Sequence, residues 1–570
     1  MQDSSKKLLF YTGLILLSFI FFNILTTSIL FLVKISITIY NFILGGIFTL
    51  LFTYIILKKA KYSQKKILLI LGGISIIISV AIASASLFYD TTYDGNNYHK
   101  VAVGSLKNGW NPNYELIEEF NVSDKNSLVL NPNNGTWLWT NHYAKGYWYY
   151  AASIYSLTNN IESGKSLYFI LVIAAILIII SYLIERTKRI ELSIGIAFLL
   201  IVNPVTIVQI FTYYNDGLLG ILIILLIFSL IMIHDDSYKI TNSLKFILLI
   251  FILTVVINLK FTGFVFAAFY CLAYFINALV NYFKYKNNKQ MIKNYLLAGF
   301  LSLVVSLGIV GSATYIKNIK YGHPFYPLYG ENKVDIITFN QPKSFGKLTN
   351  IHKFLISTFS KTDNIMSTYG DASPLYKIPG VITQEELKNL SLVDIRISGF
   401  GLLFSIILIL SLLILIIHMS NAIKEKTLFN KYLPFYLPML ITLIIIFILE
   451  GSWWARYIPQ LYIVPIIALI LSFEKNNKKS LILPKILISL MAINIYYFVS
   501  YNTQAHLENS IKIRRELKKL KKGDNVIINP DEEFAGAIYN FYDVIKKIEI
   551  TDDEIEEAQT LLYCTVKKSN

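Results

Sequence analysis

The segment 89–112 carries the residues best suited to chemistry. Asp90, Asp94, Tyr98 and His99 follow one another closely, directly after an apolar run. An alcohol is a poor nucleophile at neutral pH, and a carboxylate that takes its proton makes it a good one. An unpaired carboxylate beside hydrocarbon costs free energy, so such a residue is usually either paired with a cation or retained for a function. One of the two aspartates is therefore a candidate general base, and the alternative is a helix cap with surface solvation.

The local structure of this segment decides how the two acids lie. If the segment is helical, Asp90 and Asp94 share one face and Tyr98 lies one turn further on. The following residues, 101–110 (VAVGSLKNGW), have the pattern of a short amphipathic helix lying on a membrane surface.

Two further clusters place polar groups among aromatic rings. His142 and Lys145 lie in a stretch rich in Tyr and Trp, and Lys can meet a phosphate group. An interfacial aromatic belt is the alternative for the rings. Tyr214 and Asp216 lie in the sequence YYNDG, which either binds an acceptor or simply reverses the chain.

Four cationic positions are candidates for contact with an anionic head group. Lys260, Lys317 and His323 flank apolar runs, where snorkelling to water is the alternative. Arg456 lies between two apolar runs, and its guanidinium fork matches phosphate oxygens. A fixed cation that meets charge on a departing phosphate favours the transition state. A Glu450–Arg456 ion pair is the other interpretation.

The elements that position these residues are membrane helices. The chain has 570 residues, of which 55% are hydrophobic and only 15% charged, and apolar runs recur along nearly all of it. This predicts an all-α polytopic membrane protein with about thirteen spanning helices. They are expected at 8–30, 35–57, 67–88, 167–184, 190–210, 217–233, 246–259, 262–280, 295–316, 397–418, 432–450, 456–472 and 481–501.

The placement of Lys and Arg predicts the orientation. The short basic loops 58–66, 185–189, 234–245, 281–294, 418–431 and 473–480 alternate with the segments that carry the motifs. The positive-inside rule then puts the N-terminus in the cytoplasm and the long loops 89–166 and 317–396 outside. The first apolar run is expected to be a helix and not a cleaved signal. The net charge of +16 follows these loops, so nucleic acid is not an expected partner.

The chain is expected to divide near residue 501. Residues 1–501 form the membrane body, and residues 502–570 read as a charged helix followed by strand, turn, helix and strand. At this size the second unit is a small α/β appendage, expected outside the membrane as an accessory cap. The two cysteines indicate neither a disulfide framework nor a metal cluster.

The order of Asp94, Tyr98 and His99, the pattern D-x-x-x-Y-H, followed by NGWNP at 108–112, resembles the first outer loop of GT-C superfamily glycosyltransferases. The resemblance implies a donor sugar linked to polyprenyl phosphate and an active site on the outer face of a bacterial-type inner membrane. It further implies transfer, with inversion, to a glycan, lipid or other cell-envelope polymer. It assigns the base to Asp94, with Asp90 as second candidate. The residues themselves give the substrate-binding candidates, which are His99, His142, Lys145, Tyr214, Asp216, Lys260, Lys317, His323 and Arg456.

Two other functions remain open at this point. A polysaccharide polymerase or ligase relies mainly on arginines in its outer loops, and Arg396 and Arg456 are the clear candidates outside the tail. A transporter of lipid-linked sugars would carry charged or broken helices at the bilayer midplane. No cofactor is expected, and the spacing of Asp90 and Asp94 gives no support for a divalent metal.

Overall fold

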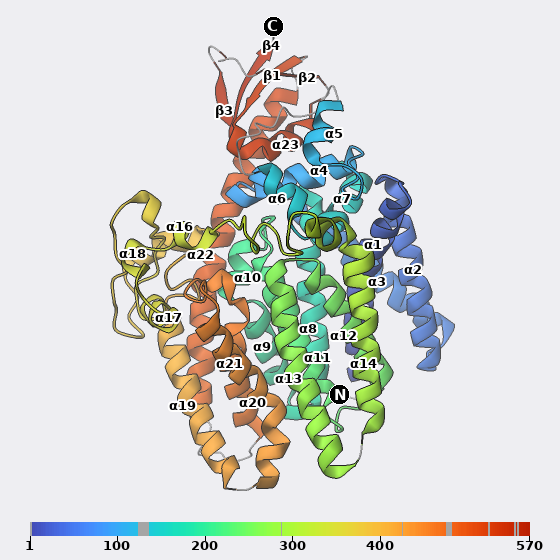
Figure 1. The fold of residues 1–570 in the computed structure, drawn as a ribbon, viewed down its shortest axis with the longest axis vertical. Helices are drawn as coiled ribbons and strands as arrows, with labels where there is room; N and C mark the ends of the chain where they lie inside the picture. The colour runs from blue at the N-terminus through green and yellow to red at the C-terminus, as the bar shows by residue number, and fades with distance from the viewer. Residues whose placement is uncertain are drawn as a thin grey trace.

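The computed structural model describes residues 3–123, 136–286, 288–424, 426–474, 482–521, 525–545, 547–551, 555 and 558–569. These residues are mostly helical, with one small sheet near the C-terminus. Figure 1 shows a bundle of long helices with the sheet at one end. Residues 124–135 of the first long loop and most of the expected basic loop 473–480 lie outside the described residues.

Ten helices of the described chain are long and apolar enough to cross a membrane, so the chain is a multi-pass membrane protein. Three other expected segments form shorter apolar helices, α9 (Ile190–Ile201), α12 (Asn242–Ile257) and α21 (Ile463–Glu474). The long helices are α1 (Asp3–Leu32), α2 (Ile39–Lys59), α3 (Gln64–Ala85), α8 (Ser166–Thr187), α11 (Asp216–Ile233), α13 (Phe261–Tyr285), α14 (Lys289–Leu303) with its π-helical continuation η3 (Val304–Val310), α19 (Phe404–Ile423), α20 (Lys426–Ile448) and α22 (Ile482–Lys521).

The segment expected as one helix at 190–210 is broken. After α9, Asn203 accepts a hydrogen bond from the backbone N–H of Thr206 and begins α10 (Pro204–Gln209). Proline at the first turn of a helix is well tolerated, but it cannot continue the preceding one. The break lets residues 210–215 reach the end of the bundle where the motifs gather.

Helices α1 and α8 run in opposite directions, because the start of α1 meets the end of α8. Lys6 of α1 pairs with Glu185 of α8 at one end of the bundle, at 2.7 Å. At the other end, Asn111 donates to the carbonyl of Phe31. The long loops lie at this second end, together with the C-terminal sheet (Figure 1).

Helix α11 forms the centre of the bundle. Its apolar window is fully buried, whereas that of α3 is only 17% buried. The exposed apolar side chains of α3 suit contact with lipid, since lipid satisfies them as well as protein does. The central position of α11 fixes its first residue, Asp216, inside the protein at the loop end.

The C-terminal unit follows directly after the last membrane helix in the chain. Helix α22 has 40 residues and continues without a break through the boundary expected at 501. The sheet has the order β2-β1-β4-β3, with β1 parallel to β2 and antiparallel to β4. Its elements are β1 (Asn525–Pro530), η11 (Glu532–Ala537), α23 (Ile538–Tyr542), β2 (Ile548–Ile550), β3 (Gln559–Leu561) and β4 (Cys564–Ser569). The expected order strand, turn, helix, strand is confirmed, and the last two strands are additional.

The expectation that residues 101–110 form a surface helix is wrong. Helix α4 (Lys100–Lys107) is buried between α7 (Gly146–Thr158) and the C-terminal unit. A Cβ atom on Gly104 would lie 2.1 Å from the ring of Tyr539, and one on Gly536 would lie 2.6 Å from the carbonyl of Asn96. The apolar face of α4 therefore packs against protein at both sides and not against lipid.

Candidate functional site

Arg456 is the meeting point of three acidic segments. Its Nη2 lies 3.0 Å from Oδ2 of Asp94, its Nε 2.9 Å from Oδ2 of Asp216, and its Nη1 3.3 Å from Oδ2 of Asp394. Asp94 precedes the π-helical turn η1 (Gly95–His99), and Asp216 begins α11. Asp394 lies in the loop before α19, and Arg456 lies in η8 (Ala455–Tyr457) after α20.

Two more cations complete this group, which we call the Arg456 cluster: Asp94, Asp216, Lys260, Asp394, Arg396 and Arg456. Lys260 pairs with Oδ1 of Asp216, and Nη2 of Arg396 lies 3.6 Å from Oδ2 of Asp394. Three carboxylates and three cations balance one another. Buried charges are tolerated when they are paired in this way.

Aromatic rings surround the arginine. The guanidinium carbon of Arg456 lies 4.8 Å from the ring centre of Tyr214, 5.2 Å from that of Trp454 and 5.7 Å from that of Tyr457. Lys260 lies 5.0 Å from the ring of Tyr457. Such cation–π contacts add attraction and exclude water. The cluster thus holds the guanidinium between three carboxylates and three aromatic rings.

Electrostatics keep Arg456 charged. Burial would lower the pKa of Arg456, but Asp216, Asp394 and Asp94 raise it well above its ordinary value. Burial raises the pKa of Asp394, while Arg456 and Arg396 oppose that rise. An acid with a raised pKa beside a permanent cation is a common feature of functional sites.

Access differs among the acids. The side chain of Asp94 is 17% exposed and that of Asp394 18%, whereas Asp216 is fully buried. Asp94 and Asp394 can therefore meet a bound molecule. Asp216 instead links Arg456 to Lys260 inside the protein.

Asp90 has a different place from Asp94. Its Oδ1 accepts hydrogen bonds from the backbone N–H and hydroxyl of Thr92, and its Oδ2 accepts one from the backbone N–H of Tyr213 at 2.7 Å. The helix begins only after Thr92, so Asp90 and Asp94 do not share a helical face. The contacts of Asp90 hold the turn that leads to Asp94 and attach it to the segment that leads to Asp216.

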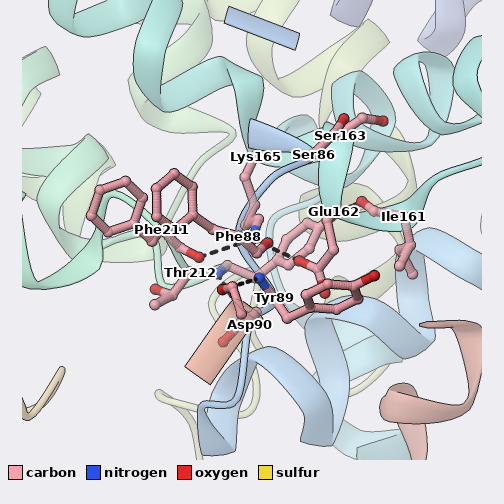
Figure 2. A network of polar contacts seen from close by, with 12 residues as sticks. Ser86, Phe88, Tyr89, Asp90, Ile161, Glu162, Ser163, Lys165, Phe211 and Thr212 are labelled. Carbon is pink, nitrogen blue, oxygen red and sulfur yellow. Dashed lines mark hydrogen bonds and ion pairs between the residues drawn. The ribbon is translucent and has the colours of Figure 1, made fainter. Parts of the chain in front are cut away.

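A second buried network supports both segments (Figure 2). Glu162 pairs with Lys100 at 2.7 Å and with Lys165 at 2.6 Å, and the side chains are almost completely buried. Lys165 also donates to the carbonyls of Phe88 and Phe211. The network joins the chain just before Asp90 to the chain just before Tyr213, which fixes their spacing.

The C-terminal unit takes part in this second network. Asn540 accepts a hydrogen bond from Lys100 and donates one to Glu162, each at 2.8 Å. Asn97, three residues after Asp94, donates to the carbonyl of Glu533. The unit therefore contacts the turn that carries Asp94 through buried polar groups.

His99 lies close to the Arg456 cluster, but its ring accepts a hydrogen bond from the protein itself. Its Nδ1 accepts a hydrogen bond from the indole N–H of Trp148 at 2.7 Å. Burial lowers the pKa of His99 to about 3, so the ring is neutral at physiological pH. A neutral imidazole suits packing and hydrogen bonding better than binding of an anion.

The remaining sequence candidates bind neighbouring backbone or side chains. His142 contacts Asn318, and burial lowers its pKa to about 4. Lys145 donates to the carbonyls of Asn141 and Tyr143, and burial lowers its pKa well below the ordinary value. Lys317 donates to the carbonyls of Pro112 and Glu115, and His323 accepts from the N–H of Phe325.

The structure thus brings together five sequence candidates, namely Asp94, Tyr214, Asp216, Lys260 and Arg456. The alternative pairing of Arg456 with Glu450 is wrong, because Arg456 pairs with the three aspartates and Glu450 is exposed. Sequence reasoning missed Asp394 and Tyr457. The signal for Asp394 was an acid two residues before an arginine, directly ahead of an apolar run.

The described residues contain no group of three His, Cys, Asp or Glu arranged to hold a metal ion. The three aspartates of the cluster instead point their Oδ2 atoms at one guanidinium. Comparison with protein-family models, with curated proteins and with solved structures finds no significant match to this chain.

Proposed function

We propose that this multi-pass membrane protein is a glycosyltransferase that uses a sugar linked to polyprenyl phosphate. The observation that carries the proposal is the contact between the carboxylate of Asp94 and the guanidinium of Arg456 at the accessible side of a buried charge cluster. It pairs a proton acceptor with a fixed cation, the two groups that this reaction needs. The resemblance of the Asp94 segment to the first outer loop of GT-C enzymes supports the same proposal.

Asp94 is the proposed general base. It takes the proton from an acceptor hydroxyl, whose oxygen attacks the anomeric carbon of the donor sugar. A new C–O bond forms on one face as the bond to the phosphate oxygen breaks on the other, so the configuration inverts. The electron pair of the broken bond leaves with the polyprenyl phosphate.

Arg456 is the proposed stabiliser of the leaving phosphate, with Lys260 beside it. Its guanidinium is held by three carboxylates and stacked on aromatic rings, so little reorganisation is needed as charge develops. A lipid-linked donor also explains why an enzyme of this kind needs no nucleotide domain. The apolar tail of the donor remains among the membrane helices.

The proposed location is the outer face of a bacterial-type inner membrane, with the N-terminus in the cytoplasm. The support is the Lys and Arg content of the loops at the end of the bundle opposite the cluster. The proposed acceptor is a glycan, lipid or other polymer of the cell envelope. No cofactor and no nucleic acid is part of the proposal.

The test is a transfer assay with purified protein in detergent. Wild type, Asp94→Asn and the control Asp371→Asn receive a mixture of polyprenyl-phosphate sugars and cell-envelope extract, and released polyprenyl phosphate is measured by mass spectrometry. Asp371 is an exposed loop residue, so its variant should match wild type. Release by wild type and the control but not by Asp94→Asn is expected.

Two results would count against the proposal. Full activity of a folded Asp94→Asn variant removes Asp94 as base. Absence of release from folded wild type in the presence of the extract refutes the reaction itself, and movement of intact lipid-linked sugar across vesicles would then favour transport.

A further inference from the structure

A polar cavity of about 280 Å³ adjoins the Arg456 cluster. Two of its lining residues, Tyr214 and Asp394, are themselves in contact with Arg456. Its walls come from the segment just before Asp94, the segment before α11, the loop before α19 and one side of α22. The lining residues are Thr91, Thr92, Tyr93, Tyr214, Asn364, Ser391, Leu392, Val393, Asp394, Ala505, His506 and Asn509.

The charge of this cavity differs from that of the cluster beside it. Among the described lining residues there is one carboxylate, Asp394, and no lysine or arginine. The ring of His506 is buried and lies against that of Phe211. A phosphate would meet no cation here, whereas an uncharged molecule rich in hydroxyl groups would find hydroxyl, amide and carboxylate partners.

Asp394 brings the carboxylate to this lining. Its side chain is 18% exposed and lines the cavity, while its Oδ2 faces Arg456 and Arg396. A carboxylate oxygen accepts hydrogen bonds from the hydroxyl groups of a ligand. The ring of Tyr93, which is 47% exposed, lines the same cavity and offers a flat apolar surface to a sugar.

We propose that this cavity binds the hydroxylated acceptor, a sugar or short glycan, and that Asp394 accepts a hydrogen bond from one of its hydroxyl groups. The inference rests on the proposed function and adds the acceptor side of the site. In this arrangement the donor phosphate contacts Arg456 and Lys260. The acceptor occupies the cavity on the other side of Tyr214 and Asp394. A volume of about 280 Å³ is near the lower bound of small-molecule sites, roughly 300 Å³. It suits a short glycan and not a polyprenyl chain.

Ala505 offers a way to close the cavity without touching the cluster. It lines the cavity from the long helix α22, so Ala505→Trp places an indole in the space of the ligand. Its neighbour Gln504 is exposed and is not part of the lining, so Gln504→Trp is a matched control.

The first experiment measures transfer of the donor sugar to an acceptor and hydrolysis of the donor by water. Purified protein receives the polyprenyl-phosphate sugar with and without a panel of alkyl glycosides as acceptors. Ala505→Trp should lower the ratio of transfer to donor hydrolysis at least tenfold, and Gln504→Trp should leave it unchanged. An unchanged ratio in a folded Ala505→Trp variant overturns the inference. Absence of any donor cleavage by wild type instead refutes the proposed function.

The second experiment does not need activity. Maleimide labelling rates of Ser391→Cys, in the cavity, and Gln504→Cys, outside it, are compared with and without the same glycosides. The native Cys271 and Cys564 are replaced by Ala in both. Glycoside should slow the labelling of residue 391 at least threefold and leave residue 504 unaffected. Equal rates with and without every glycoside of the panel overturn the inference.

Discussion

Replacement of Glu162 by Gln tests how firmly the second buried network holds the loop end. Glu162 lies between Lys100 and Lys165, and the side chains of all three are at most 1% exposed. The substitution keeps the shape of the side chain but leaves two ammonium groups buried without their carboxylate. Breaking a buried pair in this way costs about 3–5 kcal/mol.

The chain contains a matched control at the other end of the bundle. Glu185 also lies between two lysines, Lys6 and Lys188, but its side chain is 20% exposed and that of Lys188 is 65% exposed. Ion pairs that water reaches contribute about 0–1 kcal/mol. Glu185→Gln should therefore lower the free energy of unfolding by less than about 1 kcal/mol.

The assay is an unfolding titration with SDS in mixed micelles, which gives the free energy of unfolding of each variant. A third variant combines Glu162→Gln with Lys165→Met, which removes one of the two unpaired charges and should recover part of the loss. Equal losses for Glu162→Gln and Glu185→Gln, or no recovery in the combined variant, would refute the reasoning that burial makes the difference.

Two further predictions concern the cluster and the C-terminal unit. Arg456→Lys should lower the rate of sugar transfer about 100-fold while the protein stays folded. The reason is that an ammonium group cannot replace a guanidinium that meets three carboxylates. Transfer rates close to wild type would contradict this. Burial raises the pKa of Asp543, which accepts hydrogen bonds from Tyr155 and the N–H of Ile161, to about 7. The folded state then holds this proton more tightly than the unfolded chain, so stability from this group is complete below about pH 4 and falls as the pH rises through about 7. Melting temperatures of wild type and Asp543→Asn between pH 5 and 8 check this, because the decline should be smaller in the variant.

The membrane body could be predicted because its signals are local. Length and hydropathy locate an apolar helix without reference to any other part of the chain. The gathering of Asp94, Asp216, Lys260 and Arg456 at one end followed from the alternation of basic loops, since this rule fixes the end of the bundle at which each loop lies.

The parts that escaped prediction depend on distant contacts. The second acceptor oxygen of Asp90 is taken by the N–H of Tyr213, 123 residues away, and a sequence pattern cannot show such a pairing. The amphipathic pattern of helix α4 is compatible with contact to lipid and with contact to protein. Ser105 of this helix contacts Tyr539, which lies 434 residues later in the chain. Asp394 reaches Arg456 through the course of a long loop with little regular structure.

The contact between the Asp94 turn and the C-terminal unit also sets an order of events during synthesis. Asn97 and Lys100 find their partners Glu533 and Asn540 436 and 440 residues later in the chain. At roughly 5–20 residues per second, a ribosome needs about 20–90 s to cover that distance. During this interval Asn97 lacks its acceptor on Glu533, and Lys100 has Glu162 but not Asn540 as a partner. The turn that carries Asp94 therefore gains these two contacts only after Glu533 and Asn540 have been synthesised and folded.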